Sequence, residues 1–169
     1  MSELKKKPDI HTISILVANK PGVLVRCAQV FARRGYNIDS LVVSVTMNPK
    51  YSRMTITAQG DPKILDQIIK QTAKLIDVIH VVEHTGVDAI TKEFALVKVK
   101  FSPAKKVSLL KLLKKFKAGI SYQDKTIAVI EQAGTTEELD KLEDELKKFG
   151  ILEIVRSGKL VIAKGKEST

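Results

Sequence analysis

The sequence predicts an α+β protein built from two ferredoxin-like domains in tandem, each with the element order βαββαβ. Three observations support this prediction: some segments alternate apolar and polar residues as strands do, others place apolar residues on one helical face, and the order of segments occurs twice. A chain of 169 residues can form two small domains in which helices cover one face of an antiparallel sheet. We expect these domains at residues 10–84 and 94–166, joined by a linker at 85–93 that lacks a sustained period.

The first domain begins with a strand and a helix separated by an abrupt break. Apolar residues alternate from His11 to Asn19, Pro21-Gly22 ends the strand, and helical spacing then runs from Val23 to Arg34 before Gly35. Two strands joined by the turn NPKY come next, and we expect them to form a hairpin. These strands lie at 37–45 and 52–59.

The domain closes with a second helix and a fourth strand. Asp61 is suited to the N-cap and Pro62 to the first helical position, and an apolar stripe follows them. The segment DVIHVVEH, residues 77–84, then has the composition of a strand.

The second domain repeats this order. Ser102-Pro103 is predicted to begin its first helix, and Thr135 with Glu138 fits a capping box at the start of its second. The segment ILEIVRSGKLVIAKG is predicted to form a closing two-stranded hairpin that turns at Ser157-Gly158. The remaining strands are expected at 94–101, 119–123 and 126–132.

The break NKPG, at residues 19–22, is the candidate binding site. Amides at the start of a helix have no intrahelical partner, and together with the helix dipole they suit a carboxylate. Pro21 stiffens the approach, Gly22 lets a ligand reach the backbone, and the Asn19 amide can pair with an ammonium or a carboxylate. An α-amino acid carries both of these groups. A tight turn without any ligand is the alternative that the dipeptide alone leaves open.

Composition limits the other classes. A net charge of +10 is compatible with nucleic acid as a partner, yet residues 1–84 carry 12 basic and 7 acidic side chains and residues 85–169 carry 17 and 12, so neither half is a dedicated basic arm. The lysine cluster at 105–117 alternates with leucines at helical spacing, as on a solvated helix face. No apolar run approaches the ~20 residues of a membrane helix and no secretory signal is recognisable, so we expect a cytoplasmic protein without a membrane partner.

Five segments resemble, in the same order, the small regulatory subunits of acetolactate synthase, also called acetohydroxyacid synthase. They are VANKPGVL, FARRGYNIDSL, SRMTI, KLIDVIHV and FGILEIVRSG, and the resemblance runs from about Thr12 to Gly165. It implies that the first domain is an ACT domain, a module that binds amino acids at dimer interfaces, and that the second is the carboxy-terminal domain of such a subunit.

The resemblance also implies an effector and its site. In similar proteins valine is a feedback inhibitor that sits between two paired ACT domains, so we expect a homodimer through these domains. Leu24 and Ile38 are expected to contact the isopropyl group. The expected valine-binding residues are Asn19, Pro21, Gly22, Val23 and Leu24 of one chain, with Asn37 and Ile38 of its neighbour.

The function that follows is regulation of a partner. The resemblance implies a non-catalytic subunit that docks on the catalytic (large) subunit, raises its activity and makes it sensitive to valine, at the first step of branched-chain amino-acid (valine, leucine, isoleucine) biosynthesis. Thiamine diphosphate, Mg²⁺ and FAD are expected only in that partner, and no cofactor in this chain. The preferred effector among valine, leucine and isoleucine, the docking surface and the role of the second domain stay open.

The sequence leaves two other functions open. One is an amino-acid-sensing ACT-domain regulator that binds nucleic acid, which the charge favours but no helix-turn-helix segment supports. The other is a free-standing enzyme, for which no nucleophile or acid–base pair stands out. His80 and His84 lie four residues apart, which on a strand separates them by ~13 Å, so we expect neither a metal site nor a catalytic residue.

Overall fold

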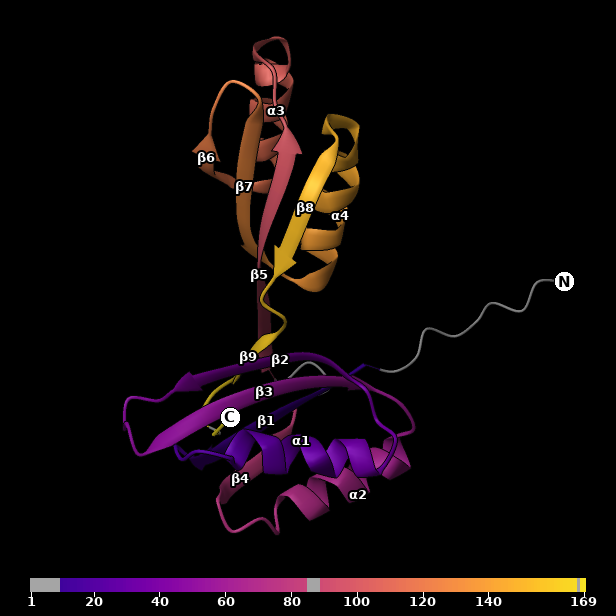
Figure 1. The fold of residues 1–169 in the computed structure, drawn as a ribbon, viewed down its shortest axis with the longest axis vertical. Helices are drawn as coiled ribbons and strands as arrows, with labels where there is room; N and C mark the ends of the chain where they lie inside the picture. The colour runs from indigo at the N-terminus through magenta and orange to yellow at the C-terminus, as the bar shows by residue number, and fades with distance from the viewer. Residues whose placement is uncertain (1–9, 85–88, 167) are drawn as a thin grey trace, which may run out of the picture. The chain divides into compact units, whose positions relative to one another are not determined.

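The computed structural model describes residues 10–84, 89–166 and 168–169, which form two compact units (Figure 1). Among the described residues, unit 1 comprises those up to Ile90 together with those from Lys159 on, and unit 2 comprises Thr91–Gly158. Each unit contains an antiparallel sheet and two α-helices of 11 residues. The predicted α+β class with two βαββαβ repeats is therefore confirmed.

Unit 1 follows the predicted order closely. Its elements are β1 (Ile10–Ala18), α1 (Val23–Arg33), β2 (Ile38–Val45), β3 (Tyr51–Gln59), α2 (Pro62–Thr72) and β4 (Val78–Glu83). The strands lie in the order β2-β3-β1-β4, and both helices cover the same face of the sheet (Figure 1). This order leaves β2 and β4 as the edge strands of the four-stranded sheet.

The core of unit 1 lies between that face and the helices. Ile15 of β1, Ile56 of β3, Phe31 of α1 and Ile68 of α2 belong to one cluster, and each is at most 1% exposed. Burying a side chain of this size stabilises the fold by about 1.5–3 kcal/mol. Cys27 belongs to the same cluster, and its burial raises the pKa of the thiol, as expected of a small core residue and not of a nucleophile.

Unit 2 repeats the arrangement with its own core. Its elements are β5 (Ala89–Lys100), a 3₁₀ turn (Pro103–Lys105), α3 (Lys106–Phe116), β6 (Gly119–Gln123), β7 (Ile127–Gly134), α4 (Thr136–Leu146), a second 3₁₀ turn (Lys147–Phe149) and β8 (Ile151–Arg156). The strands lie in the order β6-β7-β5-β8. The core combines leucines of α3 and α4 with Val97, Val99 and Ile130 of the sheet.

The predicted helix caps are confirmed in both units. The Asp61 carboxylate accepts a hydrogen bond from the Lys63 amide at 2.8 Å, with Pro62 at the first helical position. Thr135 and Glu138 form the capping box, in which each side chain accepts from the other residue's amide. The hydrogen bond that the Glu138 carboxylate accepts from the Thr135 amide is the main reason why the pKa of Glu138 is lowered. Caps of this kind depend on neighbours in sequence and are therefore readable from it.

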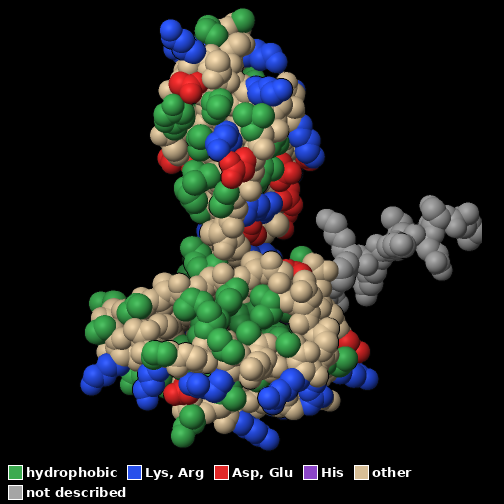
Figure 2. Space-filling view, viewed as in Figure 1, with side chains coloured by type: hydrophobic (Ala, Val, Ile, Leu, Met, Phe, Trp, Pro, Cys, Tyr) green, Lys and Arg blue, Asp and Glu red, His purple; other side chains and the backbone are tan. Residues whose placement is uncertain are grey.

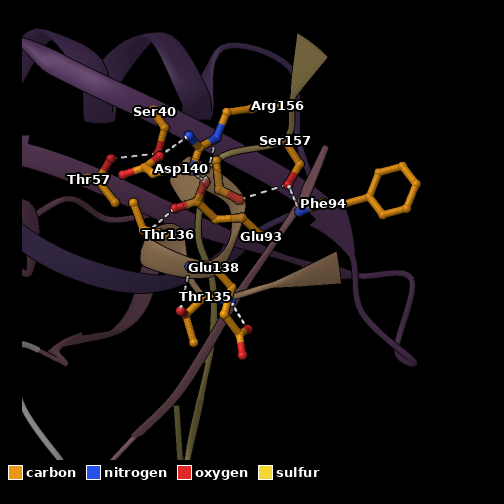
Figure 3. A network of polar contacts seen from close by, with 11 residues as sticks. Ser40, Thr57, Glu93, Phe94, Thr135, Thr136, Glu138, Asp140, Arg156 and Ser157 are labelled. Carbon is orange, nitrogen blue, oxygen red and sulfur yellow. Dashed lines mark hydrogen bonds and ion pairs between the residues drawn. The ribbon is translucent and has the colours of Figure 1, made fainter. Parts of the chain in front are cut away.

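The linker prediction needs a correction. Residues 85–88 lie outside the described residues, but β5 already begins at Ala89, so the second part of the predicted linker at 85–93 is strand. The apolar alternation is interrupted because the inward position is taken by Glu93, which is 6% exposed. Arg156 donates to it at 2.6 and 3.0 Å, and the two side chains point toward each other in Figure 3.

The predicted closing hairpin is wrong. β8 and the last strand, β9 (Leu160–Ala163), flank the turn at Ser157-Gly158, yet both pair with β5. A strand of 12 residues is long enough to take different partners along its length. The predicted second domain at 94–166 therefore loses the described residues from Lys159 on, which belong to unit 1.

Candidate functional site

The loop between β1 and α1 turns at Gly22. Gly22 has φ +81° and ψ −10°, in the left-handed region that glycine adopts without a Cβ penalty, and it is the N-cap of α1. The helix starts at Val23, where the helical spacing predicted it, because a left-handed residue such as Gly22 is not part of a right-handed helix. Since glycine has no side chain, it offers no capping oxygen to the amides of the first turn.

The backbone amides of this turn make few and long hydrogen bonds. The Val23 N–H donates to the Lys20 carbonyl at 3.4 Å, a long hydrogen bond, and the Arg26 N–H makes the first helical one, to the Gly22 carbonyl at 3.1 Å. Pro21 has no N–H to contribute. The start of the helix therefore presents donors and the positive end of a dipole, as an anion requires.

Asn19 anchors this loop to its neighbour. Its backbone N–H donates to the Lys50 carbonyl at 2.8 Å, and its side-chain Nδ2 donates to the Pro49 carbonyl at 3.0 Å. Both acceptors belong to the turn between β2 and β3. The side chain is thus held at the end of the sheet beside the helix start, with its amide orientation set by the Pro49 contact.

Arg26 is a residue of this site that the sequence reasoning missed. Its guanidinium forms an ion pair with Asp77 at 2.5 Å, and its Nη1 lies 3.1 Å from the position that a Cβ on Gly22 would occupy. A cation therefore lies next to the place where a carboxylate would bind. The sequence spacing could have identified it, because residue 26 follows residue 22 by about one helical turn and so lies on the same side of the helix start.

Asn37 and Ile38 lie at the other end of the same sheet. Ile38 is opposite Ala58 in the β2–β3 register, whereas Ala18, next to Asn19, is opposite Tyr51. Tyr51 and Ala58 lie seven residue steps apart on β3, which corresponds to roughly 24 Å of strand. The two groups of predicted ligand residues are therefore not brought together within one chain.

An antiparallel pairing of two β2 edges would join the two groups. The end of β2 at Val45 is opposite Ser52, close to the 19–24 loop, so a two-fold axis perpendicular to β2 would bring the start of β2 in one chain toward the loop of the other. Apolar side chains are exposed along this edge and on α1, where Val23 is buried but its neighbours are not. The exposed ones are Leu24, Val25, Val43 and Val45.

The described residues offer no metal site and no membrane-spanning helix. Within residues 10–84, 89–166 and 168–169 no group of three or more His, Cys, Asp or Glu side chains could hold a metal ion. No helix in the described part of the chain has the length and apolarity needed to cross a membrane. His11 pairs instead with Glu83 at 2.8 Å, and burial lowers the pKa of His84.

The chain matches two family models, one over each half. Residues 13–80 match the family model described as the AHAS small subunit-like ACT domain, and residues 92–165 match the model described as the small subunit of acetolactate synthase. The fold and the loop of unit 1 thus define an ACT-domain protein.

Relatives that match over most of their own length identify a particular family of ACT-domain proteins. The probable acetolactate synthase small subunit of Archaeoglobus fulgidus is 40% identical over 155 residues, covering 92% of this chain and 97% of its own. The acetolactate synthase small subunit of Mycolicibacterium smegmatis is 39% identical and covers 92% and 91%. The crystal structure of the Thermotoga maritima small subunit superimposes with a TM-score of 0.85 at 33% identity, covering 94% and 99%. The chain belongs to the acetolactate synthase small-subunit family.

Proposed function

We propose that this chain is a non-catalytic regulatory subunit that binds valine between two paired ACT domains. The observation that carries this proposal is the separation of the two ligand groups: Asn19 and Gly22 lie at one end of the sheet, and Asn37 and Ile38 at the other. Such a site is complete only when two chains meet, as in a homodimer through β2.

The chemistry of each group fits one part of the ligand. The amides at the start of α1, with Arg26 beside them, suit the carboxylate, and the asparagine side chains suit the ammonium. Leu24, exposed on α1, and the half-buried Ile38 of the other chain can contact the isopropyl group. Leucine and isoleucine are expected to compete, because one methylene in an apolar pocket discriminates by only ~1–3 kcal/mol.

Regulation then requires a partner and two arrangements of the dimer. We propose that the chain docks on the thiamine-diphosphate-dependent large subunit in the cytoplasm, activates it, and makes it sensitive to valine, as the first control point of branched-chain amino-acid biosynthesis. Thiamine diphosphate, Mg²⁺ and FAD belong to that partner in this scheme. Valine can inhibit only by binding one arrangement better than the other, with a coupling of ~1–3 kcal/mol.

The first test is a calorimetric valine titration of the full chain and two Gly22 variants. Gly22→Asp and Gly22→Asn both place a Cβ near Arg26, and both residues tolerate a positive φ better than most, so the backbone change is matched. Only Asp adds a carboxylate where the ligand's carboxylate would lie. We expect Gly22→Asp to weaken valine binding at least about tenfold relative to Gly22→Asn, as like charges in one site do.

A mixing experiment tests whether two chains share the site. Gly22→Asp and Asn37→Leu are each expected to remove valine binding when present in both chains, but a heterodimer keeps one intact site, built from the loop of the Asn37→Leu chain and the β2 of the other. After random exchange of subunits we expect about one quarter of the wild-type number of sites. Unchanged binding in both single variants, or no recovery on mixing, contradicts the proposed site.

A further inference from the structure

Unit 1 contains a cavity that the proposed function does not use. Its volume is about 890 Å³, and it is called the β4 cavity below. Its walls are the second half of β4 with His84, which follows that strand, and the end of β9 with the residues after it. These segments all belong to unit 1. The side chains that matter for its chemistry are His80, Glu83, His84, Lys164 and Lys166.

The β4 cavity lies on the face of the sheet away from α1 and α2. His80 is opposite Leu16, and its β1 neighbour Ile15 points to the core on the other face. In the strand order β2-β3-β1-β4, two strands separate β4 from β2, which corresponds to roughly 14 Å across the sheet. The cavity is therefore remote from the β2 edge at which two ACT domains are proposed to pair.

Groups that are positive or can be protonated converge on this cavity. Lys164 and Lys166 line it from one side and His80 and His84 from the other. Lys164 has a partner within the chain, but an ammonium carries three N–H donors and can hold a ligand as well. The acidic side chain in the lining is Glu83, whose carboxylate is engaged by His11 Nδ1 at 2.8 Å.

Arg53 adds to the positive potential without lining the cavity. Burial is the main reason why the pKa of His84 is lowered, and Arg53 and His80 lower it further. The guanidinium of Arg53 already donates to Ser14 and Thr169. It therefore contributes charge near His84, and the donors for a ligand come from the lysines and the imidazoles.

His84 supplies the observation that points to a ligand. Its Nε2 atom is buried, yet it has no hydrogen-bond partner among the described residues. Buried polar atoms are nearly always hydrogen-bonded, and this side chain lines the cavity, so the cavity is where a partner for Nε2 belongs. His11 and Gln132 also carry a buried atom in this state, but neither residue lines the β4 cavity.

Positive charge alone does not mark a site in this protein. Figure 2 shows lysine and arginine side chains over the helices of unit 1 and around the end of unit 2 near α3. Such side chains on a convex surface are solvated and hold an anion only weakly. The β4 cavity differs because its cations surround a concave space that also contains an unpaired imidazole nitrogen.

The arrangement of donors favours a phosphate group over a carboxylate. A phosphate ester carries about two negative charges near neutral pH and three acceptor oxygens, whereas a carboxylate carries one charge and two oxygens in a plane. Two ammonium groups and two imidazoles on opposite walls can serve all three oxygens. The volume of about 890 Å³ exceeds that of a phosphate group, and is within the range of sites for small molecules.

We propose that the β4 cavity binds the phosphate group of a small metabolite, with Lys164 and Lys166 as the charged ligands and His80 and His84 as further donors. This binding goes beyond the proposed function, because valine has no phosphate. It uses no residue of the proposed valine site, so it survives or fails independently of that site.

Calorimetric titration of the full chain with pyrophosphate at about 0.15 M salt is the first test, since this ionic strength screens weak surface binding. We expect saturable binding that is weakened at least about tenfold when Lys164→Met and Lys166→Met are combined. The matched control combines Lys111→Met and Lys114→Met on α3. It removes two exposed lysines from the densest lysine cluster and is expected to bind as wild type does.

The role of His84 is tested separately. His84→Phe keeps a ring but removes Nε2, and we expect it to weaken pyrophosphate binding at least about threefold, as the loss of one hydrogen bond does. NMR spectra of the histidine side chains give a second readout, since the chain has three histidines. Pyrophosphate is expected to raise the pKa of His84 in wild type, because a nearby anion stabilises the protonated imidazole.

Several results would overturn the proposal. One is the absence of saturable binding, and another is an unchanged pKa of His84 at saturating pyrophosphate. A third is an equal loss of affinity in the lysine pair of the cavity and in the control pair on α3, which would show that the anion collects on any lysine-rich surface. Citrate that binds as tightly as pyrophosphate would contradict the assignment to phosphate, because its charges are all carboxylates.

Discussion

Units 1 and 2 share one topology but treat the outer faces of their sheets in opposite ways. In unit 1 the face away from the helices carries Thr12, Ser14, Thr55 and Thr57, and each is at most 4% exposed. In unit 2 the corresponding face carries exposed apolar side chains, Val155 among them. Two sheets with the same strand order can therefore differ on the face away from the helices: it is polar and buried in unit 1, and apolar and exposed in unit 2.

Over β1, β2 and β3 the polar face of unit 1 is satisfied by its own chain. The Ser40 and Thr57 hydroxyls lie 2.5 Å apart, and Arg53 donates to the Ser14 hydroxyl at 3.0 Å and to the Thr169 carbonyl. Buried hydroxyls need such partners, since each unpaired one costs about 1–3 kcal/mol. This part of the face is thus committed to the chain's own residues, whereas the corresponding face of unit 2 leaves apolar side chains exposed.

The largest expected effect is a loss of stability in unit 2 when the Glu93–Arg156 pair, on the helix side of its sheet, is broken. Arg156→Met leaves Glu93 buried without its cation, which costs about 3–5 kcal/mol when a buried pair loses one partner. Peptide-resolved hydrogen exchange should show faster exchange across unit 2 with unit 1 unchanged. Arg156→Met combined with Glu93→Gln is the control and should recover part of the loss, and equal exchange in both variants and wild type contradicts the role of this pair.

A smaller effect is expected on the polar face of unit 1. Arg53→Met removes the hydrogen bonds to Ser14 and Thr169, for a loss of about 1–2 kcal/mol. Hydrogen exchange should increase in β9 and not in unit 2, because Arg53 ties Thr169 to this face. The control is Lys63→Met, which replaces another cation, an exposed one, by methionine and should leave hydrogen exchange in β9 unchanged. If exchange in β9 equals that of wild type in both variants, Arg53 does not stabilise β9.

The smallest expected effect is a pH dependence confined to unit 1. The pKa of His84 is lowered, first by burial and then by Arg53 and His80. As the pH falls through the ordinary range of histidine, about 6.5, the unfolded chain gains a proton that the folded chain resists, so stability decreases toward acid. Denaturant titrations at about pH 7.5 and 5.5 should show a smaller decrease for His84→Gln than for wild type. If stability decreases equally in His84→Gln and wild type, groups other than His84 cause the pH dependence.

The elements of both units were predictable because their signals are local. The caps at Asp61 and Thr135, the apolar stripes and the Pro21-Gly22 break each depend on residues within one or two helical turns. The loop proposed to bind an amino acid was found for the same reason. Where the sequence reasoning failed, at the linker and the closing hairpin, a long-range partner decided the structure.

Glu93 illustrates that failure. By sequence it interrupts an apolar alternation and indicates a connection, yet Arg156, 63 residues away, makes its burial favourable. The pairing of β9 with β5 is equally non-local. No window of neighbouring residues contains either partner, so neither feature could be predicted from a local pattern.

The sequence by itself determined the repeated βαββαβ order, the helix ends and the chemistry of the loop at Asn19–Gly22, because propensity, capping and periodicity act between neighbours. The tertiary structure alone decided that Asn19 and Asn37 stand at opposite ends of one sheet, that Arg26 lies beside Gly22, and that Leu96, Lys98 and Val155 form one open surface. Register and strand order set these distances, and both are outcomes of packing the whole chain.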